Sequence, residues 1–281
     1  MIAPAVTARR AAHAQRLVAV SKLGDTAARR LARGLIDRVH SVFARAVNLA
    51  GADGRLVTLH APGPLAAPFA IAIGALPPWG ELEPGAPVVC GGAGRLDVGA
   101  LSLDWAAARI VETSIGAGSD PGALAGALAE APDRPMAPSL SSPRALEARR
   151  RLTEGLRRGD AEQFAAGARR LIGLGEGLTP AGDDLLVGCL AVIRRFRPAF
   201  AADERIAGAL AEAARDGTTA VAREFVLEAL EGRFSELVVA VASAADAASA
   251  RAALADVLEL GATSGADTVA GMDLALAALV A

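Results

Sequence analysis

The spacing of apolar residues changes character part-way along the chain. Up to about residue 112, short apolar and β-branched runs alternate with polar positions and are separated by turns rich in Gly and Pro. This pattern predicts short strands. From Ser142 onward, apolar residues recur every three or four positions, which is typical of amphipathic helices. The sequence therefore predicts an α+β chain, with an N-terminal β-rich barrel or sandwich-like domain followed by a mostly α-helical domain.

The domain boundaries follow from this change of pattern. Residues 1–120 are expected to form the β-rich domain, with a candidate helix near residues 27–35. Residues 121–143 are rich in Pro, Ala and Ser and are expected to form a linker, with a candidate short helix at 123–130. Residues 144–281 are expected to form the helical domain.

Individual elements can be placed on the same grounds. Residues 35–49 and 55–60 flank the turn Gly51–Gly54, which predicts a hairpin. Further strands are expected at 69–73, 88–98, 101–105 and 109–112. Helices are expected at 142–158, 160–172, 202–215, 218–231, 234–244 and 247–260, in addition to two that follow glycine-rich loops.

The first of these loops concentrates residues with special backbone requirements. It lies in residues 173–188, GLGEGLTPAGDDLLVG, and apolar residues at helical spacing follow from Leu185. Pro180 is expected in the first helical turn, and Thr179 can cap that turn. A glycine-rich loop at a helix N-terminus presents free N–H groups to an anion. The candidate anion-binding residues here are Gly175, Gly177, Thr179 and Gly182.

The second loop repeats part of this pattern near the C-terminus. Residues 264–271, SGADTVAG, share Gly-x-Asp-x-x-x-Gly with the first loop and also precede an apolar helix. Ser264 and Asp267 have the spacing of a capping box, with Asp in place of Glu. We expect two helix N-termini that face one site, with Ser264, Gly265 and Asp267 as candidate binding residues. The alternative is two unrelated helix starts whose glycines permit close packing.

The carboxylates Asp183 and Asp184 allow two interpretations. At the positive end of a helix, both would be favourable for structural reasons alone. A phosphate would be repelled there unless the side chains point away or a divalent cation bridges them, and Mg²⁺ is commonly held by carboxylates together with phosphate oxygens. Mg²⁺ is therefore a candidate cofactor, with Asp183, Asp184 and Asp267 as its candidate ligands.

Histidine usage excludes several classes of site. The three histidines, His13, His40 and His60, all lie in the N-terminal half, which excludes a Ser-His-Asp or zinc site within the helical domain. The P-loop motif is also absent. His40 and Asn48 share strand parity and could face a site between the domains, although such residues are more often hydrogen-bonded polar groups of a sheet.

Composition narrows the compartment and the partners. The formal net charge is −2, which argues against a general nucleic-acid binder. Alanine causes much of the 53% hydrophobic content. The chain has no run of 18 apolar residues free of charge or glycine, so no membrane span is predicted. Cys90 and Cys189 lie in no metal-binding spacing, which favours a cytoplasmic protein. Arginine pairs on the helices are expected to form solvated faces paired with Glu.

Three stretches carry a family resemblance. Residues 171–188, together with 39–49 and 261–271, resemble the signature of the AllH-like family, formerly a domain of unknown function. The resemblance implies a subunit of oxamate carbamoyltransferase, which passes a carbamoyl group between carbamoyl phosphate and oxamate in allantoin and purine catabolism. It also implies a small anionic substrate and partner subunits, one of them similar to acyl-CoA synthetases. The motif positions it proposes for binding are Gly175, Gly177, Thr179, Gly182, Asp183, Asp184, Ser264, Gly265 and Asp267.

Two functions from different classes remain open. The chain is either an enzyme subunit with a small-anion or phosphate site at the two glycine loops, or a non-catalytic assembly subunit whose glycines let helices pack. The burial of Gly182 and Gly265 discriminates between them. An open cleft with exposed carboxylates favours the binding site, whereas burial with internally paired carboxylates favours the scaffold.

Overall fold

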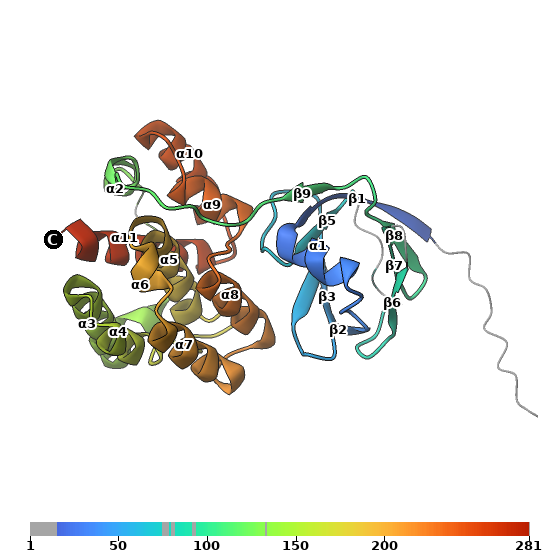
Figure 1. Ribbon diagram of the computed structural model, residues 1–281, viewed down its shortest axis with the longest axis horizontal. Helices are drawn as coiled ribbons and strands as arrows, with labels where there is room; N and C mark the ends of the chain where they lie inside the picture. Colours follow the sequence, from blue (N-terminus) through green and yellow to red (C-terminus); the bar gives the residue numbers. More distant parts are fainter. Residues whose placement is uncertain (1–15, 75–78, 80–81, 92–93, 133, 281) are drawn as a thin grey trace, which may run out of the picture. The chain divides into compact units, whose positions relative to one another are not determined.

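The computed structural model describes residues 16–74, 79, 82–91, 94–132 and 134–280 (Figure 1). His13 lies outside them. The chain divides into two compact units, of which the first holds most described residues up to Arg109. The second comprises Ile110 onward with the short segments Gly24–Thr26 and Pro64–Ala70. Each unit is described by itself below.

The first unit is a nine-stranded, nearly closed sheet. Its main strand order is β2-β3-β4-β5-β1-β8-β7-β6, with β9 also paired to β1. The elements are β1 (Arg16–Gly24), α1 (Asp25–Ala32), β2 (Arg38–Val42), β3 (Ala46–Ala50), β4 (Leu56–His60), β5 (Ala70–Ile73), β6 (Val88–Gly91), β7 (Arg95–Val98), β8 (Leu101–Asp104) and β9 (Arg109–Val111). Strand β1 pairs antiparallel with β5 and parallel with β8. The pairs β2–β3, β3–β4, β6–β7 and β7–β8 are antiparallel. A bridge between Arg38 and Pro87 joins the two ends of the order.

Apolar side chains fill the inside of this sheet. Leu49, Leu59, Ile71 and Leu103 are almost completely buried, and each comes from a different strand. One inner face lined by β-branched and leucine side chains is what a curved, closing sheet requires. The expected barrel-like domain followed by helices is therefore confirmed.

Two details of the strands differ from expectation. Residues 35–49 contain two strands and not one. Strand β2 ends at Val42, β3 begins at Ala46, and the two strands pair with each other. The turn between them contains neither Gly nor Pro, so the sequence carries no signal for it. Strand β1, with the sequence RLVAVSKLG, was not among the expected strands.

The second unit is helical. Its elements are α2 (Gly122–Ala129), the 3₁₀ helix η1 (Pro138–Ser141), α3 (Pro143–Arg158), α4 (Ala161–Ala168), α5 (Ala181–Phe196), α6 (Pro198–Ala201), α7 (Glu204–Gly217), α8 (Ala220–Leu230), α9 (Glu236–Ala242), α10 (Ala247–Leu258) and α11 (Ser264–Val280). Side chains of Ser142, Asp160 and Asp246 cap three of these helices by accepting N–H bonds, as N-cap residues should. Residues 121–143, expected as a linker, contain α2 and η1 and bury Leu124 and Leu140.

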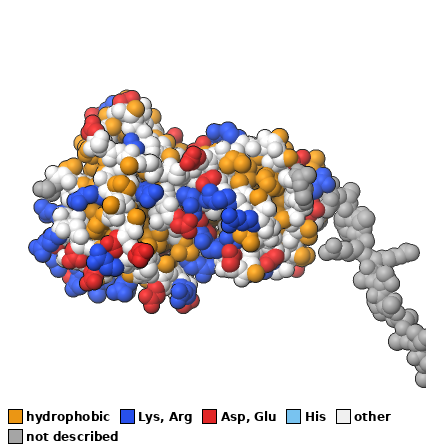
Figure 2. Space-filling view, in the orientation of Figure 1, with side chains coloured by type: hydrophobic (Ala, Val, Ile, Leu, Met, Phe, Trp, Pro, Cys, Tyr) orange, Lys and Arg blue, Asp and Glu red, His pale blue; other side chains and the backbone are white. Residues whose placement is uncertain are grey.

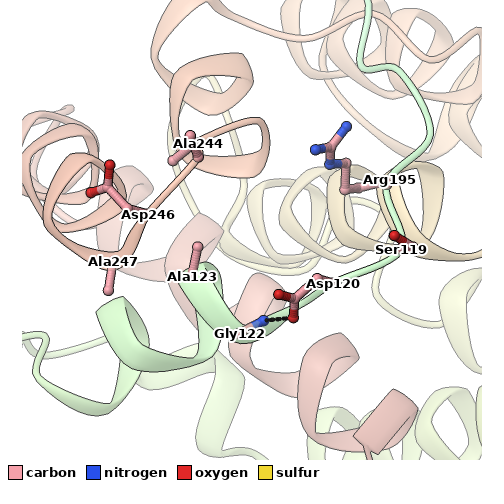
Figure 3. Close-up of a pocket in the computed structure, with 10 residues that line it drawn as sticks. Ser119, Asp120, Gly122, Ala123, Arg195, Ala244, Asp246 and Ala247 are labelled. Atoms are coloured by element: carbon pink, nitrogen blue, oxygen red, sulfur yellow. Dashed lines mark hydrogen bonds between the residues drawn. The ribbon is translucent and has the colours of Figure 1, made fainter.

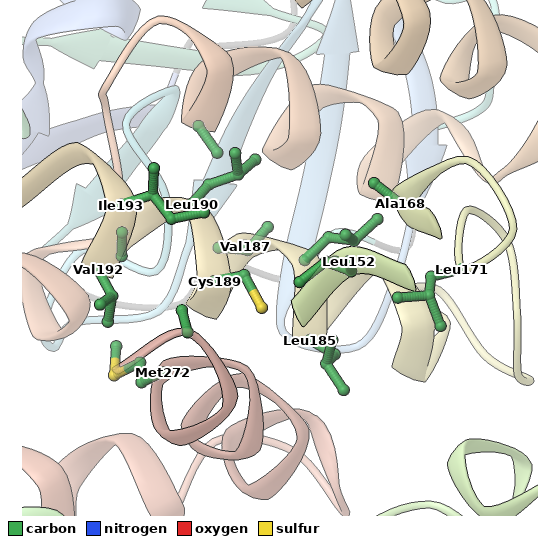
Figure 4. Packing of buried hydrophobic residues seen from close by; sticks show 14 of the residues in the cluster. Leu152, Ala168, Leu171, Leu185, Val187, Cys189, Leu190, Val192, Ile193 and Met272 are labelled. Atoms are coloured by element: carbon green, nitrogen blue, oxygen red, sulfur yellow. The ribbon is translucent and has the colours of Figure 1, made fainter. Parts of the chain in front are cut away.

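Helix α5 is the centre of this unit. Its residues are buried along most of its length, and Figure 4 shows Val192 of α5 beside Met272 of α11, with Cys189 on the same side of α5. The surface is charged by contrast. On the face shown in Figure 2, acidic and basic side chains are interspersed. On α3, Glu147 pairs with Arg150 and Arg151, as expected for a solvated arginine face. On α5, Arg195 instead donates to the backbone carbonyls of Gly116 and Ala117.

Helices α5 and α11 approach each other through a reciprocal pair of glycines. A Cβ at Gly188 would lie 1.9 Å from the carbonyl oxygen of Thr268, and a Cβ at Gly271 would lie 1.9 Å from that of Leu185. These positions correspond in the two Gly-x-Asp-x-x-x-Gly segments, so the sequence repeat is also a structural one. Any larger side chain at either glycine would force the helices apart.

Among the described residues, no helix combines the length and the apolar character needed to cross a membrane.

The glycine contact gives a direct stability prediction. We expect Gly271→Ala to lower the free energy of unfolding by about 2–3 kcal/mol, because its methyl group would overlap a backbone carbonyl. Gly208→Ala is the matched control, since Gly208 lies inside α7 with no atom within 4 Å of an added Cβ. That variant should gain about 0.5–1 kcal/mol from helix propensity. Urea denaturation measures both, and equal effects of the two substitutions would contradict the packing argument.

Candidate functional site

The glycine loop before α5 has a backbone that only glycine adopts freely. Gly173, Gly175 and Gly177 have φ angles of 67°, 122° and 92°, all in the left-handed region. Gly177 has open space around its missing Cβ, so its conformation and not crowding requires glycine. The alternating glycines of the sequence therefore shape a sharp loop between α4 and α5.

Asp183 holds this loop to the helices. Its side chain is 1% exposed. One carboxylate oxygen accepts bonds from the Gly173 N–H at 3.1 Å and from the Thr218 hydroxyl at 2.7 Å. Burial raises its pKa to about 6, although these two bonds oppose that shift. With its hydrogen bonds made inside the protein, Asp183 connects the loop to the junction between α7 and α8.

The next residue, Asp184, faces the N-terminus of α11. Its neighbours are Thr179 and Ser264, whose hydroxyl oxygens lie 3.0 Å apart. Burial raises the pKa of Asp184 to about 7, and the nearby charges of Asp267 and Asp183 add to this rise. The two hydroxyls work in the opposite direction. The two helix N-termini thus meet at Thr179 and Ser264, which brings the two predicted motifs together.

Both predicted caps are wrong. Pro180 is the N-cap residue of α5 and makes no side-chain cap bond, because Thr179 turns its hydroxyl toward Ser264. Asp267 does not complete a capping box, because its Oδ1 instead accepts the Ala137 N–H at 2.9 Å, just before η1. Instead of capping their own helices, both side chains contact residues that are distant in the sequence.

Asp267 is fully buried but only partly hydrogen-bonded. It is 0% exposed, and burial raises its pKa. Its Oδ2 atom has no hydrogen-bond partner within the described part of the chain. The same holds for Asp184 Oδ2 and for the hydroxyl of Ser139 in η1. Three buried polar atoms around the two helix N-termini are therefore left without partners, which is uncommon in native structures.

A pocket of about 360 Å³ opens beside these atoms. We call it the loop pocket. Its lining residues come from η1 and the residue before it, from the glycine loop, and from the N-terminal ends of α5 and α11. They are Ala137, Pro138, Ser139, Gly175, Glu176, Thr179, Ala181 and Thr263. Within the described residues, the backbone N–H groups from Gly175 to Thr179 make no hydrogen bond. The lining thus includes residues of a loop with unused N–H donors, together with Ser139, whose hydroxyl has no partner among the described residues.

Gly182 and Gly265 have a different role. A Cβ at Gly182 would lie 2.0 Å from the carbonyl oxygen of Leu171, and one at Gly265 would lie 2.0 Å from that of Val257. Both glycines are buried against backbone and neither lines the loop pocket. They permit close packing, while Gly175 and Thr179 line the opening.

His40 and Asn48 lie in the first unit. Asn48 is 3% exposed, accepts the Thr58 hydroxyl at 2.6 Å and donates to the Ser41 hydroxyl at 3.0 Å. His40 is exposed beside an irregularity in the β2–β3 register, and its Nδ1 lies 3.1 Å from the Ser41 hydroxyl. Ser41 therefore connects the two residues within the sheet.

The carboxylates do not make an evident metal centre. Among the described residues, no group of three or more His, Cys, Asp or Glu side chains is arranged to hold a metal ion. Asp183 explains part of this result, because its bonds to Gly173 and Thr218 use the carboxylate that the predicted Mg²⁺ site required.

Several site residues escaped the sequence analysis. Ser139 and Ala137 lie in the stretch interpreted as a linker, and Thr218 lies far from both motifs. Thr263 directly precedes the second motif but was not singled out. The short step Pro138–Ser139 is a turn signal, but nothing in it indicates contact with α11.

A second pocket of about 520 Å³ lies among the starts of α2 and α10 and the end of α5. Figure 3 shows Arg195, Asp120 and Asp246 around it. Arg195 donates to the carbonyls of Gly116 and Ala117, while Asp120 and Asp246 accept N–H bonds at the starts of α2 and α10. These charged groups hold the segments that form the pocket.

Comparison with protein-family models identifies the chain. Residues 15–110 match the AllH family N-terminal domain, and residues 171–276 match the model described as oxamate carbamoyltransferase subunit AllH. The two matches together cover most of the chain, which therefore belongs to the AllH family. Neither the curated proteins nor the solved structures contained a significant match.

The raised pKa of Asp184 predicts a pH-dependent stability. In the unfolded chain this carboxyl loses its proton near pH 4, whereas in the folded chain it does so near pH 7. The free energy of unfolding should therefore fall as the pH rises through this window. In Asp184→Asn, the fall between pH 5 and pH 8 should be smaller by on the order of 2 kcal/mol. Urea denaturation at both pH values measures it.

Asp273→Asn controls for the substitution itself, because Asp273 lies on the exposed side of the same helix as Asp267. An identical pH dependence in Asp184→Asn and the unmodified protein would show that Asp184 does not titrate as described.

Proposed function

We propose that this member of the AllH family is a subunit of an oxamate carbamoyltransferase and that its loop pocket binds a small anionic substrate of that reaction. The reaction passes a carbamoyl group between carbamoyl phosphate and oxamate. Towards oxalurate, the amide nitrogen of oxamate bonds to the carbamoyl carbon, the bond from that carbon to the phosphate oxygen breaks, and the nitrogen loses a proton. The pathway proposed for it is allantoin and purine catabolism in the cytoplasm.

The unused N–H groups of the glycine loop carry this proposal. A row of free backbone N–H groups just before a helix is a general anion-binding arrangement. Here Gly175, Glu176 and Thr179 also line a pocket large enough for a compound of the size of oxamate. Because no Lys or Arg is among the described lining residues and Glu176 is, the backbone would provide most of the attraction.

A subunit implies a complex, and the proposed partners are the other subunits of the transferase. The loop pocket of this chain alone offers backbone donors but no positive side chain. In the proposal, partner subunits contribute the cationic groups that neutralise the phosphate during transfer. Mg²⁺ is a further candidate for that role.

A non-catalytic assembly subunit is the second candidate function, and a specific observation favours it. Gly182, Gly188, Gly265 and Gly271 each fit tightly against a neighbouring backbone carbonyl. These contacts account for a large part of both motifs by packing alone. On this alternative, the loop pocket would have no ligand and the chain would organise its partners.

Ligand-dependent stability separates the two functions. Thermal unfolding of the isolated chain would be followed with oxamate, carbamoyl phosphate and inorganic phosphate at millimolar concentrations. A ligand present at 100 times its Kd stabilises the native state by about 2.7 kcal/mol, which gives a clear rise in Tm. We expect such a rise with at least oxamate or carbamoyl phosphate.

Ser139→Leu should abolish the rise by filling the loop pocket with a larger side chain, whereas Ser119→Leu in the second pocket should retain it. Circular dichroism would verify that both variants fold. An unchanged Tm with every ligand would refute the binding function of the isolated chain and favour the assembly subunit.

A further inference from the structure

Both ends of the glycine loop are attached to one short segment, the junction between α7 and α8. This junction comprises Gly217, the last residue of α7, followed by Thr218 and Thr219, which precede α8. The Thr218 hydroxyl donates to Asp183 Oδ2 at 2.7 Å, and the same oxygen accepts the Gly173 N–H at 3.1 Å. The start of the loop is therefore held to the junction through one carboxylate oxygen.

The other end of the loop is held by the next residue of the junction. The Thr219 hydroxyl donates to the carbonyl oxygen of Leu178 at 2.5 Å and accepts the Ala222 N–H at 3.1 Å. The second of these bonds makes Thr219 the N-cap residue of α8. A hydroxyl group can donate one bond and accept another, so both bonds can exist together. Thr219 thus joins the loop to the helix that it caps.

A third contact brings the two backbones together. A Cβ at Gly173 would lie 1.9 Å from the carbonyl oxygen of Gly217. This close approach and a φ angle of 67° both explain why position 173 requires glycine. Two consecutive threonines and one backbone contact therefore attach the loop to the same junction.

The middle of the loop depends on these attachments. The backbone N–H groups of Gly175, Glu176 and Gly177 make no hydrogen bond within the described residues. Gly175 and Gly177 also have left-handed φ angles, and glycine has more conformational freedom than any other residue. A segment of this kind keeps one shape only when the surrounding structure holds it.

We propose that Thr218 and Thr219 are positioning residues, whose hydroxyls hold the glycine loop in the shape that binds an anion in the loop pocket. The inference rests on the proposed function and adds to it the part of the fold that prepares the binding loop. Neither threonine lines the loop pocket, so both act through the loop. The apparent Kd of a ligand rises as the binding-competent shape becomes less populated. Loss of either attachment should therefore weaken binding.

Substitutions of Thr218 test the first attachment. Thr218→Val keeps the side-chain shape and suits the extended backbone at this position, but it removes the donor to Asp183. Thr218→Ser keeps that donor. Isothermal titration of the whole chain with oxamate and with carbamoyl phosphate would be done at pH 8, where Asp183 is ionised because its pKa is about 6. We expect Kd to rise about tenfold in Thr218→Val, as for one hydrogen bond to a charged group, and less than about twofold in Thr218→Ser.

Thr113→Val is the matched control for Thr218→Val. The Thr113 hydroxyl also donates to a carboxylate, that of Asp25, but neither residue lines the loop pocket. Losing this bond should lower the free energy of unfolding and leave Kd unchanged, because nearly all molecules remain folded and binding-competent. If Thr113→Val weakened binding as much as Thr218→Val, the inference would be overturned, since the effect would then not depend on the loop.

The second attachment has its own pair of variants. Thr219→Ala removes the bond to Leu178 together with the cap of α8. Ser235→Ala removes a cap of the same kind, because the Ser235 hydroxyl accepts the Val238 N–H at the start of α9. Both variants should lose stability, but only Thr219→Ala should weaken binding, by about threefold or more.

The outcomes separate this inference from the function on which it rests. Where the unmodified chain binds, an unchanged Kd in Thr218→Val or in Thr219→Ala would refute the role of that threonine and leave the proposed function standing. Equal weakening in Thr218→Ser and Thr218→Val would also overturn the inference, because the hydroxyl would then not be the group that holds the loop. No binding of either compound to the unmodified chain would overturn the proposed binding function and the inference together.

Discussion

The close contact between α5 and α11 determines most of what the second unit can do. Gly188 and Gly271 let each helix reach the backbone of the other, with carbonyl oxygens where a Cβ would otherwise lie. Side chains of ordinary size would hold the two helix axes further apart. The contact brings Thr179 and Ser264 within hydrogen-bonding distance, so two motifs separated by more than 80 positions in the sequence share one place.

This arrangement concentrates charge where it is unfavourable. Burial and mutual repulsion raise the pKa of Asp184 to about 7 and burial raises that of Asp267, and two of their oxygens have no partner in the described structure. The carboxylates nevertheless hold segments together, since Asp267 accepts the Ala137 N–H and the hydroxyls of Thr179 and Ser264 interact with Asp184. Buried carboxyl groups with raised pKa values are characteristic of functional sites.

The sequence predicted the fold class and the pairing of the two motifs, but not the details of the site. Spacing of apolar residues was enough to predict short strands followed by helices, although it marked neither β1 nor the break between β2 and β3. The shared Gly-x-Asp-x-x-x-Gly pattern indicated that Asp184 and Asp267 belong together. The roles of Thr179 and Asp267 as caps were wrong, because tertiary partners competed for their side chains. Ser139 and Ala137 could not be found, because a long-range contact such as that of the Ala137 N–H with Asp267 leaves no local pattern.

The neighbours Asp183 and Asp184 show why motif residues should be assigned one by one. Successive residues of an α-helix point about 100° apart, so the two carboxylates face different surroundings. Asp183 meets the Gly173 N–H and the Thr218 hydroxyl and becomes a structural clamp. Asp184 points toward α11, where hydroxyls and a second carboxylate leave one of its oxygens unpartnered. The same division separates the glycines, because Gly182 is needed for packing and Gly175 for the pocket. A motif that resembles a single binding signature therefore contains two kinds of residue: those that pack the helices together and those that would contact a ligand.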